Sequence, residues 1–238
     1  MTSDHITELC LTHTSNLFEV SIGIDCIDKC INKLHFLSYS KLILYKFNSL
    51  GYRDYEWPDD IKQKQWCIGD SFTLGLGQPD NECWPQLVSA LLNSPIINVS
   101  MNGASNDWIA RRAKYIIDHF DPSVILIQWS YIHRRESTEP LTCDEDRAIW
   151  YGNNHDDLGN LFKNVVSVNH KTAIIVHSFI PQFCRAEDAD IIYNFFNKHN
   201  LLFFPFISHL DYARDGHHYD VLTASEYANN YLRCIRTR

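Results

Sequence analysis

The segment "WCIGDSFTLGLG", from Trp66 to Gly77, decides the fold, because it sets a short apolar run directly before a Gly-Asp-Ser step. A run such as "WCIG" is typical of a strand buried in a sheet. The glycines that follow indicate a tight turn. Ser71 therefore stands at the predicted end of a strand, where it serves either a turn that needs a small polar residue or a reaction that needs a hydroxyl.

Downstream of Gln65 the chain alternates apolar runs with helical periodicities, which is typical of a parallel sheet covered by helices. The predicted strands lie at residues 66–69, 95–100, 123–129, 172–179 and 201–207. The predicted helices lie at residues 80–94, 106–120, 158–168, 188–200 and 224–235. Right-handed crossovers between such strands give an α/β fold, a three-layer α/β/α sandwich with a flavodoxin-like parallel five-stranded sheet. Function in such sheets sits at the carboxyl ends of the strands.

The first two helices of this pattern have recognisable starts. In residues 80–94 an apolar stripe begins at Trp84, with Asp80 or Asn81 as the expected N-cap and Pro85 near the first turn. In residues 106–120 the cap is expected near Asn106 or Asp107. Both signals support helices that connect neighbouring strands.

Two regions depart from the alternation. Residues 134–157 are polar and longer than an ordinary connection, which predicts a lid-like loop or a short helix. Residues 1–64 read as a strand and a helix, then an extended run that enters a turn at 48–51. No Gly/Ser/Pro linker follows, so we predict an N-terminal extension, residues 1–64, packed on a core domain, residues 65–238.

The composition of the chain argues against some classes of protein and of binding partner. The chain has 238 residues, 45% of them hydrophobic, and a formal net charge of −8. Nucleic acid is an unfavourable partner, because binding to it depends on Lys and Arg. The N-terminal sequence has no basic-then-apolar leader, and no run of about 18 apolar residues predicts a membrane span. The expectation is a soluble cytoplasmic protein that uses no membrane and no cofactor.

Eight cysteines are scattered along the chain without the spacing of a disulfide framework. Cys26 and Cys30 would share one face of a helix, with His5, Cys10 and His13 as conceivable partners for zinc. No second paired motif completes a tetrahedral set. Ordinary packing of buried thiols is therefore the favoured interpretation, and no metal is expected.

Two further segments bring polar side chains to the same edge of the predicted sheet. In "NVSMNGASND", after the second strand, Gly103 offers a backbone N–H, with Asn102 and Asn106 as amide donors. In "DYARDGHHYD", after the last strand, Asp215 and His218 can form an acid–base pair. His209 and His217 compete with His218 for this role. Each segment alone is also compatible with an ordinary turn. Together they supply a nucleophile, donors and a base.

The order of these motifs resembles the SGNH (GDSL-type) hydrolase superfamily, whose members cleave acyl esters with a Ser-His-Asp triad on a flavodoxin-like sandwich. The stretch "FNSLGYRDYEW" also resembles the N-S-x-G-[FY]-R-x-x-E lead-in of a subset of these domains. The similarity runs from Lys46 to the C-terminus. It implies that Ser71 is the nucleophile, that Asp215 and His218 complete the triad, and that the backbone N–H groups of Ser71 and Gly103 form the oxyanion hole.

The chain departs from the family after the third strand, where "QWSYIHRRE" stands in place of G-x-N-D and its oxyanion asparagine. Gln128 and Asn106 are the expected replacements, with Ser130 and Tyr131 as further possibilities. The neighbouring polar and aromatic residues are expected to bind substrate: Asp70, Trp129, Ser130, Arg134 and Arg135. For the two arginines, a solvated charged loop is the competing interpretation.

The leading hypothesis is therefore a serine esterase acting on a small acyl ester, such as an O-acetyl group on a carbohydrate. A first alternative is an SGNH-fold binding or structural module with weakened or absent catalysis, motivated by the missing asparagine. A second is an O-acyltransferase to a sugar hydroxyl, motivated by the lead-in. All three use a small-molecule or carbohydrate partner.

Overall fold

A sheet of five parallel strands lies at the centre of the computed structural model. The model describes residues 2–11, 18–19, 23–136, 149–150, 154–170, 173–181, 184, 186–204 and 206–237. The sheet strands are β3 (Gln65–Gly69), β4 (Ile96–Ser100), β5 (Val124–Trp129), β8 (Ile174–Phe179) and β9 (Leu202–Phe203). Their order is β4-β3-β5-β8-β9, and every neighbouring pair is parallel. This is the flavodoxin-type order, and the predicted fold class is confirmed.

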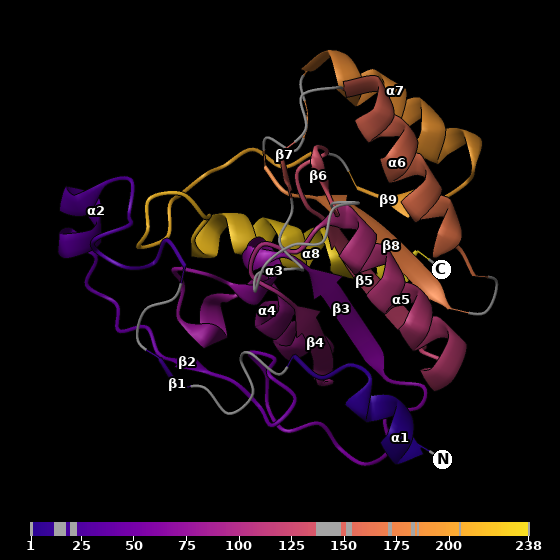
Figure 1. Ribbon diagram of the computed structural model, residues 1–238, viewed down its shortest axis with the longest axis horizontal. Helices are drawn as coiled ribbons and strands as arrows, with labels where there is room; N and C mark the ends of the chain where they lie inside the picture. The colour runs from indigo at the N-terminus through magenta and orange to yellow at the C-terminus, as the bar shows by residue number, and fades with distance from the viewer. Residues whose placement is uncertain are drawn as a thin grey trace.

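Helices cover both faces of the sheet (Figure 1). On one face α4 (Trp84–Leu92) packs against α8 (Val221–Arg236). On the other face α5 (Asn106–Phe120) packs against α6 (Asn154–Ser167), and α6 meets α7 (Ala186–Lys198) through stacked rings of Phe162 and Phe195. Strands β3, β4, β5 and β8 are almost entirely buried between these layers, which explains their nearly continuous apolar sequence.

The observed ends of some helices and strands differ from the predicted ends. Helix α5 begins at Asn106 and ends at Phe120 as predicted, but its N-cap is Ser105, whose side chain accepts from the Trp108 N–H. The predicted start at Asp80 is instead a separate 3₁₀ turn, η1 (Asp80–Glu82), with Cys83 as the cap of α4. The last strand is only two residues long, shorter than the predicted 201–207, and residue 205 lies outside the described residues.

The N-terminal residues surround one side of the sheet. They form α1 (Thr2–Thr7), β1 (Phe18–Glu19), α2 (Lys33–Ser38) and β2 (Tyr45–Lys46), with β1 antiparallel to β2. Helix α1 packs on α5, and α2 lies far from it at the edge of the molecule (Figure 1). Leu9, Leu11 and Ile61 are buried in the same apolar core as the sheet.

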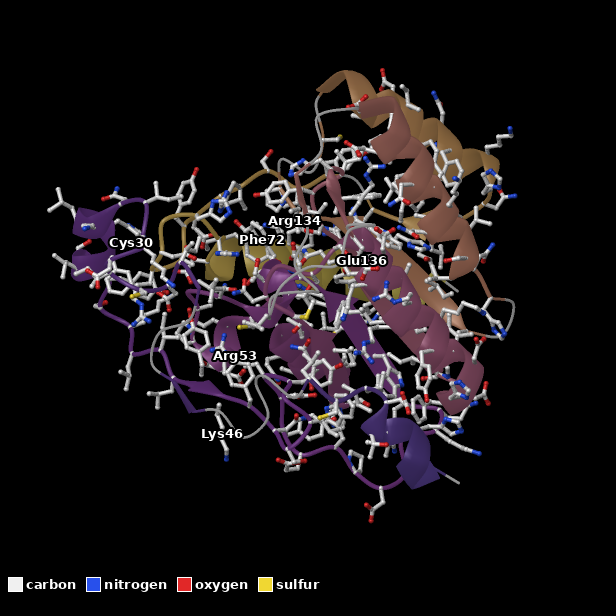
Figure 2. The ribbon with its side chains drawn as sticks, in the orientation of Figure 1. Cys30, Lys46, Arg53, Phe72, Arg134 and Glu136 are labelled. Carbon is white, nitrogen blue, oxygen red and sulfur yellow. The ribbon has the colours of Figure 1, made fainter. Side chains whose placement is uncertain are left out.

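The pair Cys26 and Cys30 lies in a turn and not in a helix. The Cys30 N–H donates to the Cys26 carbonyl at 2.8 Å, and the next helix starts only at Lys33. Their predicted helical face is therefore wrong. Cys10 follows α1, and His13 falls outside the described residues. Figure 2 shows Cys30 on the outlying part of the chain that carries α2.

After β5 the chain forms a short antiparallel pair of β6 (Arg134–Arg135) and β7 (Ile149–Trp150). The loop predicted at 134–157 falls for the most part outside the described residues, and only these two strands and the start of α6 belong to them. Within the part of the chain that the structure describes, none of the helices has the length and apolar character needed to span a membrane.

Candidate active site

Ser71 is the first residue of the short helix α3 (Ser71–Leu74), directly after β3. Asp70 caps this helix, since its side chain accepts from the Phe72 N–H at 3.0 Å. Gly75 closes it in the left-handed conformation with φ 75°. The Gly-Asp-Ser motif thus ends the strand, caps the helix and presents the serine at the carboxyl edge of the sheet.

Ser71 is one end of a chain of hydrogen bonds. Its Oγ lies 2.8 Å from His218 Nε2, and His218 Nδ1 lies 2.6 Å from Asp215 Oδ2. Asp215 Oδ1 also accepts from the backbone N–H groups of His217 and His218, at 2.9 and 3.0 Å. With the imidazole proton on Nδ1, His218 donates to Asp215 and accepts from Ser71, which is the arrangement of a general base held by a carboxylate.

Electrostatics around this pair favour an ionised carboxylate. Burial raises the pKa of Asp215, but the charge and hydrogen bond of His218 and the two backbone N–H groups outweigh it and lower the pKa below its usual value. The competing His217 is uncharged at neutral pH, because burial and the neighbouring His218 lower its pKa to about 4. Burial likewise lowers the pKa of His209. Of the three candidate histidines, His218 is the one hydrogen-bonded to Ser71.

Two backbone N–H groups lie at the ends of neighbouring strands. Gly103 sits in the turn after β4 with φ 79°. Among the described residues, neither the Gly103 N–H nor the Ser71 N–H donates to any acceptor. Such donors suit a developing oxyanion, because they gain a hydrogen bond only when charge forms there.

The two side chains expected to complete the oxyanion hole have other partners. The Gln128 side-chain oxygen accepts from Thr73 Oγ1 at 2.9 Å and Trp84 Nε1 at 3.2 Å, and its amide donates to the Tyr219 hydroxyl at 3.1 Å. These groups are all buried, so Gln128 supports the fold beneath α3 and does not face a substrate. Its predicted role as a donor is corrected.

Asn106 holds the chain that leaves β5. Its side-chain oxygen accepts from the Ser130 N–H at 2.9 Å, and its amide donates to the Tyr131 carbonyl at 3.1 Å. The side chain is buried at the start of α5. Asn106 therefore fixes residues 130 and 131 relative to α5, and its expected place in the oxyanion hole is also corrected.

The residues expected to bind substrate form an internal network. Asp70 is fully buried, accepts a hydrogen bond from Ser130 Oγ and pairs with Arg134 at 3.3 Å. This ion pair neutralises the charge next to Ser71, and the polar groups of Asp70, Ser130 and Arg134 bind one another at the start of α3.

Trp129 and Arg135 also point to internal partners. Trp129 is fully buried and its indole N–H donates to His177 Nδ1 at 3.1 Å, since β5 is covered on both faces. Arg135 pairs with the buried Asp157 at 2.8 Å. The prediction that these side chains contact substrate is corrected for Trp129, and Arg135 connects β6 to α6.

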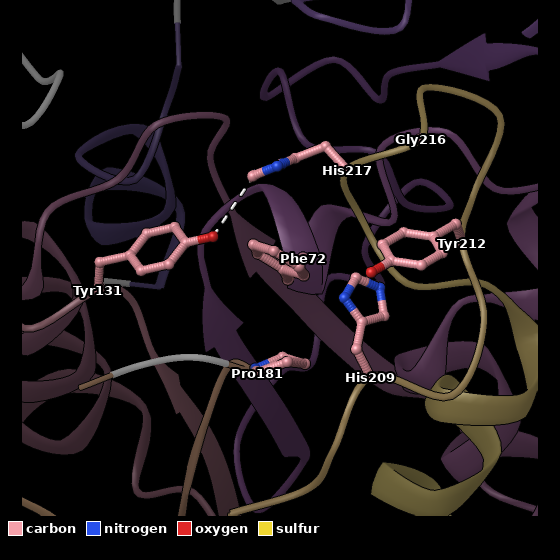
Figure 3. A pocket seen from close by; sticks show the side chains of 7 residues that line it. All are labelled: Phe72, Tyr131, Pro181, His209, Tyr212, Gly216 and His217. Atoms are coloured by element: carbon pink, nitrogen blue, oxygen red, sulfur yellow. Dashed lines mark hydrogen bonds between the residues drawn. The ribbon is translucent and has the colours of Figure 1, made fainter. Parts of the chain in front are cut away.

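A cavity of about 200 Å³ opens beside the triad (Figure 3). Its lining residues are Phe72, Tyr131, Pro181, His209, Tyr212, Gly216 and His217. The Tyr131 hydroxyl lies 3.4 Å from His217 Nε2, across the cavity. The sequence had already indicated Tyr131, His209 and His217 as candidates, but not Phe72 or Tyr212. For Phe72 the available signal was its position, because it follows Ser71 directly in the sequence.

The stretch before β3, residues 47–57, contacts the segment that follows Ser71. Asn48 accepts from the N–H groups of Leu50 and Tyr52 and shapes the predicted turn. Arg53, 2% exposed, donates to the carbonyls of Leu74, Gly75 and Gln78, at 3.1, 2.6 and 2.8 Å. A cation at the carbonyl end of α3 satisfies groups that the short helix leaves unpaired. Arg53 thereby fixes the segment that begins with Ser71.

The sequence matches no family model, and no curated protein matches it. Solved structures do match. A family two carbohydrate esterase from Clostridium thermocellum, in complex with cellohexaose, aligns with a TM-score of 0.52 and 17% identity over 76% of this chain and 65% of that chain. TesA aligns with a TM-score of 0.51 and 14% identity over 74% of this chain and 99% of that chain.

An acetyl xylan esterase, Est2A, from the rumen bacterium Butyrivibrio proteoclasticus aligns with a TM-score of 0.50 and 13% identity over 76% of this chain and 65% of that chain. This chain thus spans just under two thirds of the length of the two carbohydrate esterases. At these identities the similarity establishes the fold, which is the SGNH hydrolase fold that the motifs predicted.

Proposed function

We propose that this protein is a serine ester hydrolase that removes a small acyl group, such as acetyl, from a carbohydrate. The observation that carries the proposal is the hydrogen-bonded chain from Ser71 through His218 to Asp215, at 2.8 and 2.6 Å. Two segments that are far apart in sequence supply a nucleophile, a base and a carboxylate in the order that acyl transfer requires. The fold shared with esterases is consistent with this chemistry.

The proposed reaction uses these groups in turn. His218 Nε2 accepts the proton of Ser71 as Oγ attacks the ester carbonyl, and Asp215 stabilises the imidazolium that forms. The backbone N–H groups of Ser71 and Gly103 donate to the oxyanion. The imidazolium then gives its proton to the departing alcohol. Water, activated by the same His218, releases the acid from the acyl-enzyme and restores the serine.

The cavity supports a small neutral substrate. Its volume of about 200 Å³ is below the range of about 300–1,000 Å³ of sites for larger ligands, so it suits a short acyl group or a single sugar ring. Phe72, Tyr131 and Tyr212 offer aromatic faces to C–H groups, and none of the lining residues is a lysine, arginine or carboxylate. The nearby Arg134 is paired with Asp70, which argues against an acidic substrate.

The proposal is tested by measuring acetate release from acetylated xylo-oligosaccharides and from p-nitrophenyl acetate, with the Ser71→Ala variant as control. We expect release by the parent, a clear preference for acetyl over dodecanoyl esters, and no release above background by the variant. Equal release by both proteins contradicts the proposal. Absence of turnover with a folded parent supports the inactive-module alternative. Acetyl transfer to an added oligosaccharide in excess of free acetate identifies the transferase alternative.

A further inference from the structure

Residues 23–46, here called the N-terminal segment, contact the loop that carries the acid and the base. That loop, residues 213–218, is here called the acid–base loop. Asp25 in the N-terminal segment is fully buried. Its two carboxylate oxygens accept from Arg214 Nε at 2.7 Å and from an Arg214 terminal nitrogen at 2.5 Å. Arg214 is the residue directly before Asp215, so a bidentate ion pair joins residues 189 positions apart next to the triad.

Tyr45 orients this carboxylate. Its hydroxyl donates to Asp25 Oδ2 at 2.5 Å and accepts from the Gly77 N–H at 2.7 Å. Burial and the adjacent Asp25 raise the pKa of Tyr45, so the hydroxyl keeps the proton that it donates. The Gly77 carbonyl in turn accepts from the Arg214 N–H at 3.0 Å. Asp25 is thus connected to the acid–base loop both through the Arg214 side chain and through the segment that follows Ser71.

The N-terminal segment also touches the acid–base loop at a second place. The His35 imidazole Nε2 lies 2.8 Å from the Ala213 carbonyl. A Cβ on Gly216 would lie 3.4 Å from Asn32 Cβ and 3.7 Å from a ring carbon of His35. The start and the turn of the acid–base loop therefore pack against residues around α2.

The N-terminal segment also contacts a residue that follows the acid–base loop and a residue beside Gly103. Lys41 pairs with Asp220 at 3.2 Å, and the Tyr39 hydroxyl donates to the same carboxylate at 3.1 Å, two residues after His218. A Cβ on Gly23 would lie 2.8 Å from Asn102 Nδ2, next to the oxyanion donor Gly103. The N-terminal segment thus touches both loops that complete the site around Ser71.

We propose that the N-terminal segment is part of the catalytic unit, with Asp25 as a positioning residue that fixes Asp215 and His218 through its ion pair with Arg214. This inference rests on the proposed function for its catalytic consequence. It assigns a role to a stretch of chain that lies almost entirely before the motifs of the site. The physical reason is that a buried, bidentate charge pair has one geometry, and removing one partner leaves a buried charge unpaired.

The first test measures the loop itself and needs no activity. Hydrogen exchange is followed at the amides of Ala213, Arg214 and Gly216, which donate within the loop or to Gly77. In Asp25→Asn we expect these amides to exchange at least about tenfold faster than in the parent, with the amides of β3 and β5 unchanged. The matched control is Asp28→Asn, the same change at an exposed carboxylate three residues away, which leaves exchange unchanged.

The second test measures catalysis on the ester found for the parent. We expect Asp25→Asn to lower kcat about 10- to 100-fold with KM changed less than about threefold, because a small displacement of the base affects the reaction more than binding. The double variant Asp25→Asn with Arg214→Gln recovers part of kcat, since the arginine charge that has lost its carboxylate is then removed as well. Tyr52→Phe removes a buried hydrogen bond to Leu9 away from the loop and serves as the control for general destabilisation.

The outcomes are separable. Unchanged exchange in Asp25→Asn overturns the link between the two segments, and faster exchange with unchanged kcat overturns the positioning role. A parent that hydrolyses no ester overturns the proposed function, while the exchange data still decide whether Asp25 holds the loop. If Asp25→Asn does not fold, Tyr45→Phe removes only the hydroxyl between Asp25 and Gly77, and the same exchange and kcat criteria apply to it.

Discussion

The ends of β3 and β5 lie next to each other in the sheet, and both carry polar side chains, yet those side chains differ in what they bind. At the end of β3, Ser71 Oγ has His218 as its hydrogen-bond partner, and the Ser71 N–H has no acceptor among the described residues. At the end of β5, Gln128 and Ser130 are buried and bonded to other parts of the protein. The first strand end carries the groups that the proposed reaction uses, and the second fixes the fold around them.

This difference explains how the fold holds the hydrogen-bonded chain of Ser71, His218 and Asp215 without a G-x-N-D motif after β5. The residues in its place are used for structure: Gln128 supports α3 from below, and Arg134 neutralises Asp70 beside the nucleophile. In the proposed mechanism, Ser71 and Gly103 remain as oxyanion donors from the backbone. Loss of one donor lowers the rate by about 10²- to 10³-fold in known cases and does not abolish the reaction.

The largest effect is expected from the base at the reactive strand end. His218→Ala leaves Ser71 without an acceptor for its proton, and we expect kcat to fall about 10⁶-fold, as for a removed triad histidine in a serine protease. Single-turnover kinetics on p-nitrophenyl acetate measure it. The control is His217→Ala, which changes the cavity wall and not the triad. A larger loss in His217→Ala than in His218→Ala would reverse the assignment.

A smaller effect is expected for the carboxylate. Asp215→Asn preserves the shape but donates to His218 Nδ1, which favours the wrong tautomer, and kcat is expected to fall about 10⁴-fold. The same single-turnover assay measures it, and circular dichroism checks that the variant is folded. A kcat within about tenfold of the parent would mean that Asp215 does not orient the base.

At the structural strand end the expected effect is on stability. Gln128→Leu leaves the buried Thr73, Trp84 and Tyr219 groups without their partner, at a cost of about 1–3 kcal/mol for each group left unsatisfied. Urea denaturation measures the free energy of unfolding. We expect the rate at which a fluorophosphonate modifies Ser71, per folded molecule, to stay near that of the parent. A normal stability with a large loss of reactivity would place Gln128 in the oxyanion hole after all.

The sequence predicted most of the fold because its signals are local. Five apolar runs gave the strands, and the helix at 106–120 has the predicted bounds. The short β9 shows the limit, since "LLFFPFI" is apolar throughout and only Pro205 indicated that pairing would stop. The turn at 48–51 was predictable from its own residues. The helix cap at Ser105 was missed because several neighbouring residues can cap.

The candidate site divides in the same way. Ser71, Asp215 and His218 lie in short motifs, so their approach to one another follows from the topology alone. The partners of Gln128, Asp70 and Arg134 depend on side-chain directions at strand ends, which a single sequence does not specify. The sequence around Asp25 gave no indication of its role, because that role depends on the ion pair with Arg214, 189 residues away.

The smallest effect is expected for His177, whose side chain is hydrogen-bonded to Trp129 at the end of β5. Burial lowers the pKa of His177 to about 3, against about 6.5 in an unfolded chain. The unfolded state then binds the proton first, so the stability contributed above pH 6.5 is lost progressively as the pH falls toward 3. Thermal unfolding between pH 7 and 4 should show a falling Tm with a shallower slope in His177→Gln. An equal slope of Tm against pH in the parent and in His177→Gln would exclude His177 as a source of this pH dependence.

The most direct test of the central claim is mass spectrometry of the protein after reaction with a fluorophosphonate. The account predicts one adduct per molecule, mapped to Ser71, that is absent from Ser71→Ala and strongly slowed in His218→Ala. An unmodified Ser71 in the folded parent, or an adduct of equal yield in Ser71→Ala, would contradict it.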